Sequence, residues 1–219
     1  MQLNITPIVL RLVIVNVVVY LLLDLGLLQI LGIENIAAIK NQFFVLHKSD
    51  MIIPRAYDAG NFLPIQLVTS FFTHGGFLHI FFNMWVLISF GSIIEMVLGA
   101  KRFLAFYLFC GVVGSALTAI LDPSPIPVVG ASGAIFGVMV AFAIFFPNQK
   151  ITFFMPFPIT MKSRIWMMVI GGLSALLVTL SALDIAPGIT GGISHFGHLA
   201  GMISAIIFFY SGIHASIGK

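Results

Sequence analysis

Two residues able to carry out acyl-transfer chemistry lie in apolar stretches of the chain, where polar side chains are rare. Ser132 lies within the sequence Gly-Ala-Ser-Gly at the start of one stretch, and His198 lies near the start of another. Polar side chains are costly inside a membrane, so several of them on separate apolar segments indicate a site. A serine hydroxyl beside a neutral imidazole provides a nucleophile and a general base. We therefore expect Ser132 and His198 to form a hydrolytic centre.

Two further polar residues, His79 and Asn83, are four positions apart in a third apolar stretch and so share one face of a helix. An imidazole N–H and a carboxamide suit an oxyanion hole, the set of donors that stabilises the negative oxygen formed during acyl transfer. The alternative interpretation is that both side chains only hydrogen-bond neighbouring helices. His74, next to Gly75 and Gly76, lies just before this third stretch and is expected to fix the loop that leads into it.

The elements that must position these residues are transmembrane helices. Of the 219 residues, 60% are hydrophobic and only 8% are charged, whereas soluble domains carry about 25% charged residues. Six apolar segments have roughly the 20 residues that a helix needs to cross a bilayer. They lie at about 8–32, 77–98, 103–121, 131–147, 165–183 and 193–213. The sequence therefore predicts an all-α membrane protein, with one six-helix domain over residues 1–219 and the lipid bilayer as its partner.

Basic residues predict the orientation of this domain, because short cytoplasmic loops are rich in lysine and arginine. One side of the predicted topology holds Lys101, Arg102, Lys150, Lys162, Arg164 and Lys219. Both termini are then cytoplasmic, and the net charge of +3 reflects loop bias rather than nucleic-acid binding. The second, fourth and sixth segments run in the same direction. Ser132, His198, His79 and Asn83 are therefore expected at similar depths in the outer half of the membrane.

Stripes of small residues predict that the fourth and sixth segments pack closely. The stripes are Gly133-x3-Gly137-x3-Ala141 and Gly197-x3-Gly201-x3-Ala205. Spacing of this kind lets two helix backbones approach each other, which would bring His198 within reach of Ser132. Gly130 permits a tight turn before Ser132, and a helix that starts there offers free backbone N–H groups.

Other chemistries are weaker interpretations of the same sequence. His195 and His198 share a helix face, but no carboxylate or cysteine accompanies them and no HExxH pattern occurs, so we predict no metal and no cofactor. Asp24 and Asp184 lack the GxGD surroundings of aspartyl intramembrane proteases. No acidic residue is placed to orient His198, which favours a dyad over a triad. Glu95, at the end of the second segment, is expected to be structural.

Four motifs lie within residues 62–212, and their joint occurrence identifies a protein family far more specifically than any one of them alone. They are His74-x4-His79-x3-Asn83-Met84, Gly91-x3-Glu95-x3-Gly99 followed by Arg102-Phe103, Gly130-Ala131-Ser132-Gly133, and Gly197-His198-x2-Gly201. This set resembles the rhomboid intramembrane serine proteases. The resemblance implies a six-helix fold around a water-filled cavity that opens to the outside.

By motif match, the resemblance implies that Ser132 is the nucleophile and His198 the general base. His79 and Asn83, with the Ser132 backbone N–H, would form the oxyanion hole, and His74 would fix the first loop. The substrates would be single-pass membrane proteins cut in or near their transmembrane segment, at small residues with helix-destabilising residues nearby. No cofactor is implied.

The chain departs from the family pattern at two places. Many members carry Trp-Arg where this chain has Ile65-Gln66 after Pro64, which bears on the conformation of the first loop. Many have tyrosine where Phe136 stands; a phenyl ring can pack on the histidine but lacks the hydroxyl. No seventh apolar segment and no cytosolic domain are seen, which is the minimal form of the family.

Two rival functions remain open at this point. A non-catalytic rhomboid-like protein that binds membrane clients usually lacks the serine or the histidine, and this chain keeps both. A small transporter would show charged pathway residues or inverted repeats, and neither is evident. Short loops and the absence of a transit peptide favour a bacterial inner membrane. The sequence does not predict an oligomeric state.

Overall fold

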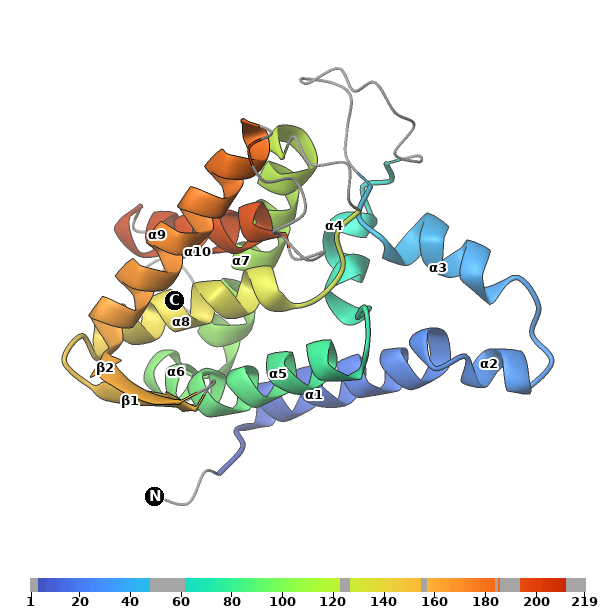
Figure 1. Ribbon diagram of the computed structural model, residues 1–219. Helices are drawn as coiled ribbons and strands as arrows, with labels where there is room; N and C mark the ends of the chain where they lie inside the picture. Colours follow the sequence, from blue (N-terminus) through green and yellow to red (C-terminus); the bar gives the residue numbers. More distant parts are fainter. Residues whose placement is uncertain are drawn as a thin grey trace.

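Helices dominate the chain, which is described by a computed structural model over residues 4–47, 62–122, 127–154, 157–183, 185 and 194–211. The elements, in order, are α1 (Pro7–Val19) with the π-helical turn η1 (Tyr20–Asp24), α2 (Leu27–Ile30), α3 (Ile36–Phe44), α4 (Gln66–Thr69) with the 3₁₀ turn η2 (Ser70–Phe72), α5 (Phe77–Val86), the π-helical turn η3 (Leu87–Gly91), α6 (Ser92–Leu98), α7 (Ala100–Leu121), α8 (Ser132–Phe145), β1 (Lys150–Phe154), β2 (Pro158–Lys162), α9 (Ser163–Ala182) and α10 (His195–Tyr210). Figure 1 shows their arrangement.

The predicted all-α membrane fold is confirmed. In the described part of the chain, four helices are long and apolar enough to cross a bilayer: Pro7–Asp24, Phe77–Leu98, Ala100–Leu121 and Ser163–Ala182. The shorter helices α8 and α10 are also apolar. Apart from the first, the helices agree to within about three residues with the predicted segments, and the count of six spans stays a prediction.

The first predicted segment, 8–32, is wrong in its second half. The helix that begins at Pro7 ends at Asp24, because Gly26 adopts a left-handed conformation with φ of 71° that a right-handed helix cannot contain. The apolar residues beyond it form only the four-residue helix α2, and Ile30 is 78% exposed. Hydrophobicity alone did not reveal this break, since the run of leucines continues through it.

The core lies where α10 packs against both α7 and α8. A second layer consists of α1 beside the continuous helix formed by α5, η3 and α6, and Figure 1 shows these two running side by side. The glycine at 91 lets them approach, because a Cβ there would lie 3.1 Å from a methyl of Val9.

An antiparallel hairpin, β1–β2, occupies the connection between α8 and α9, which the sequence indicated only as a loop. Its strands pair from Lys150 with Lys162 to Phe154 with Pro158. The ring of Phe153 stacks near Phe90 of η3 and meets Trp166 of α9 edge-on at 4.6 Å. The hairpin therefore links the second layer to α9 at the end of α8 opposite Ser132.

Glu95 has the structural role expected from the sequence. Its carboxylate accepts hydrogen bonds from the backbone N–H groups of Ile8 and Val9 and from the hydroxyl of Thr6. These are the N–H groups that the first turn of α1 leaves without helical partners. A negative charge at this position also interacts favourably with the helix dipole.

Candidate active site

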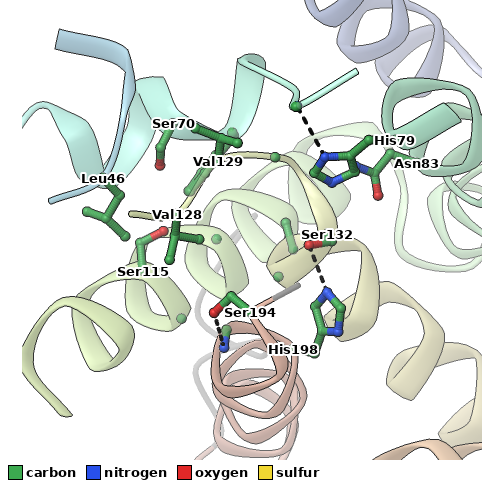
Figure 2. A pocket seen from close by; sticks show the side chains of 18 of the residues that line it. Leu46, Ser70, His79, Asn83, Ser115, Val128, Val129, Ser132, Ser194 and His198 are labelled. Carbon is green, nitrogen blue, oxygen red and sulfur yellow. Dashed lines mark hydrogen bonds between the residues drawn. The ribbon is translucent and has the colours of Figure 1, made fainter. Parts of the chain in front are cut away.

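The side chains of Ser132 and His198 meet between two helices. Ser132 is the first residue of α8, and His198 lies in the first turn of α10. The hydroxyl Oγ of Ser132 is 3.0 Å from Nε2 of His198, within hydrogen-bonding distance (Figure 2). With a neutral ring that carries its proton on Nδ1, Nε2 would accept the hydrogen bond from the serine hydroxyl.

Close contact between α8 and α10 brings these two side chains together, as the small-residue stripes predict. A Cβ at Gly201 would lie 2.0 Å from the carbonyl oxygen of Gly133, and one at Gly137 would lie 3.3 Å from the carbonyl oxygen of Gly201. Any larger side chain at Gly201 would therefore push the backbones apart. Since Gly133 follows Ser132 and Gly201 lies one turn beyond His198, this contact sets the distance between the two side chains.

The turn before α8 is shaped by Gly130. Its φ of 110° is in the region that favours glycine, and its N–H donates to the carbonyl of Ser70 at 2.8 Å. A Cβ at Gly130 would lie 2.8 Å from both Cε1 and Nε2 of His79. Glycine is thus required here both for the backbone conformation and for the approach of the His79 ring.

His79 and Asn83 lie on one face of α5 and point towards this turn (Figure 2). Nδ1 of His79 accepts a hydrogen bond from the backbone N–H of Gly75 at 3.3 Å, so a neutral ring carries its proton on Nε2. Nδ2 of Asn83 is buried and has no hydrogen-bond partner among the described residues. Two donors, one imidazole N–H and one amide N–H, are therefore directed at the loop that leads into Ser132.

The ring of Phe136 stacks on His198 with 4.0 Å between centroids and 12° between planes. Phe136 is one turn after Ser132 on α8, so the helix that carries the serine also limits the rotation of the histidine. Phenylalanine in place of the family's tyrosine therefore still packs on the His198 ring.

A cavity of about 830 Å³ connects these groups. Ser132, His198, His79 and Asn83 all line it, and it continues along small and polar residues of α7. These residues are Gly111, Gly114, Ser115 and Thr118. The hydroxyl groups of Ser115 and Thr118 are hydrogen-bonding groups for water, which a hydrolytic reaction inside a membrane requires.

His74 lies in the turn between η2 and α5, and its side chain is buried. Its ring meets that of His79 edge-on, with 5.1 Å between centroids. Burial lowers the pKa of His74 to about 3 from its ordinary 6.5, and repulsion from His79 whenever that ring is protonated acts in the same direction. The ring is therefore neutral at physiological pH.

The described parts of the first loop, residues 25–47 and 62–76, are held by residues that the sequence did not single out for this role. Gln66, at the place of the family's arginine, is buried; its Oε1 accepts from the His47 N–H, and its Nε2 donates to the carbonyl of Gln42 at 2.8 Å. The carboxylate of Asp24 forms an ion pair with Lys40 of α3. Neither interaction follows a helical period, so no pattern in the sequence could have revealed these partners.

The remaining candidates add no further chemistry. His195 meets His198 edge-on at 6.0 Å. In the described ranges, no group of three or more His, Cys, Asp and Glu residues is placed to hold a metal ion. No carboxylate of the described residues hydrogen-bonds His198, whose Nε2 contacts the hydroxyl of Ser132. Asp184 lies outside the described residues.

Fold and site together define a helical integral membrane protein with a serine–histidine pair at an internal cavity. A family model for the Rhomboid domain matches residues 63–214, which is more than half of the chain. The chain therefore belongs to the rhomboid family.

Curated relatives agree with this assignment. The chain is 38% identical over 88 residues to the putative rhomboid protease YdcA of Bacillus subtilis (strain 168), a match that covers 39% of this chain and 44% of the relative. It is 38% identical over 104 residues to the mitochondrial Rhomboid protein 1 of Saccharomyces cerevisiae, covering 43% of this chain and 29% of the relative. It is 31% identical over 147 residues to the mitochondrial presenilin-associated rhomboid-like protein A of Danio rerio, a match that covers 65% of this chain and 36% of the relative. The chain thus spans less than half the length of each of these relatives.

Proposed function

We propose that this chain is an intramembrane serine endopeptidase that uses Ser132 and His198 as a catalytic dyad. The observation that carries the proposal is the 3.0 Å contact between Ser132 Oγ and His198 Nε2 at the wall of a cavity. Membership of a family whose relatives include named proteases supports the reaction class.

In the acylation step, Nε2 of His198 takes the hydroxyl proton of Ser132 while Oγ attacks the carbonyl carbon of the scissile peptide bond. The carbonyl π electrons move onto oxygen, which becomes the oxyanion of a tetrahedral intermediate. When this intermediate collapses, the C–N bond breaks and the protonated imidazole gives its proton to the leaving amine. The products are an acyl-enzyme on Ser132 and a free amino terminus.

The oxyanion would be stabilised by Nε2–H of His79, by the amide of Asn83 and by the backbone N–H of Ser132. The unpartnered Nδ2 of Asn83 supports this role, since a buried donor without an acceptor costs free energy unless a ligand supplies one. The backbone N–H of Ser132 is at the first position of α8, where the helix itself provides no acceptor.

In the deacylation step, a water molecule from the cavity attacks the acyl carbonyl, with His198 as general base. The ester C–O bond to Ser132 breaks, the serine recovers its proton and the carboxylate product leaves. As proposed, both steps use the Ser132–His198 pair, the three oxyanion donors and water.

The substrates we propose are single-pass transmembrane proteins cut in or near their membrane segment. For location, we propose a bacterial inner membrane, which the short loops favour. We propose cytoplasmic termini on the basis of the basic residues in those loops. Lys150 and Lys162, which pair at the base of the β hairpin, lie at the end of α8 opposite Ser132. That separation supports a catalytic centre that faces the outer side.

The test is cleavage of a model single-pass substrate by the purified protein in detergent, with Ser132→Ala and Ser89→Ala in parallel. Ser89 is a matched control, because among the described residues its hydroxyl donates to the carbonyl of Trp85 in its own helix. We expect cleavage by the wild type and by Ser89→Ala and none by Ser132→Ala. Cleavage by Ser132→Ala would refute Ser132 as the nucleophile. Absence of cleavage across several substrates, together with no labelling of Ser132 by a fluorophosphonate, would favour a non-catalytic client-binding protein.

A further inference from the structure

Asp24 is a nearly buried carboxylate that the reaction described above does not use. It ends the π-helical turn η1, and its side chain is 4% exposed. One oxygen pairs with the ammonium of Lys40 on α3, while the other accepts the backbone N–H of His74 at 3.1 Å. An ion this buried is costly unless it has partners; here one oxygen is ion-paired and the other accepts a hydrogen bond. One carboxylate therefore joins α1, α3 and the turn before α5.

The turn that Asp24 holds is in direct contact with His79. The backbone N–H of His74 donates to Asp24, and the backbone N–H of the next residue, Gly75, donates to Nδ1 of His79. The ring of His74 lies edge-on against the ring of His79. The two contacts that orient the His79 ring from this side thus come from His74, which Asp24 holds directly, and from Gly75 beside it.

The orientation of the His79 ring matters because its Nε2 edge belongs to the candidate oxyanion hole. With Nδ1 as acceptor, the proton is on Nε2, and that edge of the ring faces Gly130 in the loop leading to Ser132. If the turn shifts, Gly75 no longer fixes the tautomer, and the ring is free to rotate or to carry its proton on Nδ1. Either change removes a hydrogen-bond donor from the candidate oxyanion hole.

We propose that Asp24 is a positioning residue for catalysis: clamped by Lys40, it fixes the turn at residues 74–76, which holds His79 as the Nε2–H tautomer aimed at the oxyanion. This inference rests on the proposed function. It assigns Asp24 no contact with the substrate.

The first loop has other anchors, so the loss of Asp24 does not release it altogether. The hydroxyl of Thr73 donates to the carbonyl of Phe44 at 2.8 Å, that of Thr69 donates to the carbonyl of Phe43, and the Gln66 amide donates to the carbonyl of Gln42. Substitutions of Asp24 are therefore expected to change the geometry of the turn within a folded protein.

The first measurement is the tautomer of His79, read from two-bond ¹H–¹⁵N spectra of the purified protein with ¹⁵N-labelled histidine. His79→Ala identifies the signals. We expect the wild type to show Nε2–H, Asp24→Ala to show a mixed or altered state, and Asp24→Asn to retain most of the wild-type pattern, since its amide oxygen still accepts the His74 N–H. Asp122→Asn, another nearly buried carboxylate, is the control and should leave His79 unchanged. An unaltered His79 signal in Asp24→Ala would overturn the proposal.

The second measurement is a cycle of cleavage rates with Asp24→Ala, His79→Ala and the double variant. We expect Asp24→Ala to lower kcat about tenfold with KM within twofold, and to have little further effect once His79 is absent. Equal losses in both backgrounds would mean a general structural role and would refute action through His79. The tautomer readout does not need catalysis, so a wild type that cleaves nothing would refute the proposed function while the spectra still decide the role of Asp24.

Discussion

The contact between Gly201 and Gly133 offers a direct test of how the helix packing sets the serine–histidine distance. In Gly201→Ala, the new Cβ would lie 2.0 Å from the carbonyl oxygen of Gly133, 2.6 Å from its carbonyl carbon and 3.0 Å from its Cα. All three atoms are backbone, so no side-chain rotation relieves the clash. Reaching an ordinary contact of about 3.4 Å requires a local separation of about 1.4 Å.

Most of that displacement is transmitted to the dyad, because His198 is one turn from Gly201 and Ser132 precedes Gly133. The Oγ–Nε2 distance would grow from 3.0 Å to about 4 Å, beyond hydrogen-bonding reach. Misplacement of catalytic groups by about 1 Å costs on the order of 100-fold in rate. Overpacking also destabilises a core by about 1–3 kcal/mol. We therefore expect kcat to fall at least about 100-fold in a protein that still folds.

The assay is single-turnover cleavage together with the rate of fluorophosphonate labelling of Ser132, both corrected for the folded fraction by size-exclusion chromatography. Gly172→Ala is the matched control, because a Cβ at Gly172 on α9 meets no atom within 4 Å. It makes the same chemical change in a membrane helix and should keep full activity. If Gly201→Ala labels and cleaves within threefold of the wild type, the helix contact does not determine the dyad geometry and the reasoning is wrong.

Three further outcomes are expected. Asn83→Ala should lower kcat roughly 100-fold while KM changes little, since an oxyanion donor acts in the transition state; weaker binding at unchanged kcat would remove Asn83 from that role. Glu95→Gln should reduce the unfolding free energy by about 1–2 kcal/mol through the weaker cap on α1, with kcat per folded molecule unchanged in the cleavage assay. Because the pKa of His74 falls to about 3, the unfolded chain binds one more proton there between about pH 6.5 and pH 3. Stability should therefore decline as the pH falls through that window, and His74→Asn should flatten the decline in thermal unfolding curves.

Much of the fold follows from apolar segments alone. The helices Phe77–Leu98 and Ser163–Ala182 lie where continuous hydrophobicity places them. The error in the first segment has a local cause, since composition does not show whether Gly26 is helical or left-handed. The hairpin was missed because its alternation is short and flanked by an apolar helix on each side.

The convergence of Ser132, His198, His79 and Asn83 was predictable because it depends on topology and on small-residue spacing, both of which are periodic. The ion pair of Asp24 with Lys40 was not, since it joins the end of a membrane helix to a loop helix beyond the left-handed Gly26. Interactions of this kind depend on how the loop folds back, which no local pattern encodes.

The carboxylate that caps α1 also bears on the order of assembly. When the first helix enters a membrane, its leading N–H groups have no acceptor of their own, and Glu95 follows Ile8 by 87 positions in the sequence. The first helix is therefore completed only after the second has been inserted beside it. The first two membrane helices would then already be packed together when the helices that carry Ser132 and His198 are inserted. The catalytic helices would therefore assemble later, against the packed pair.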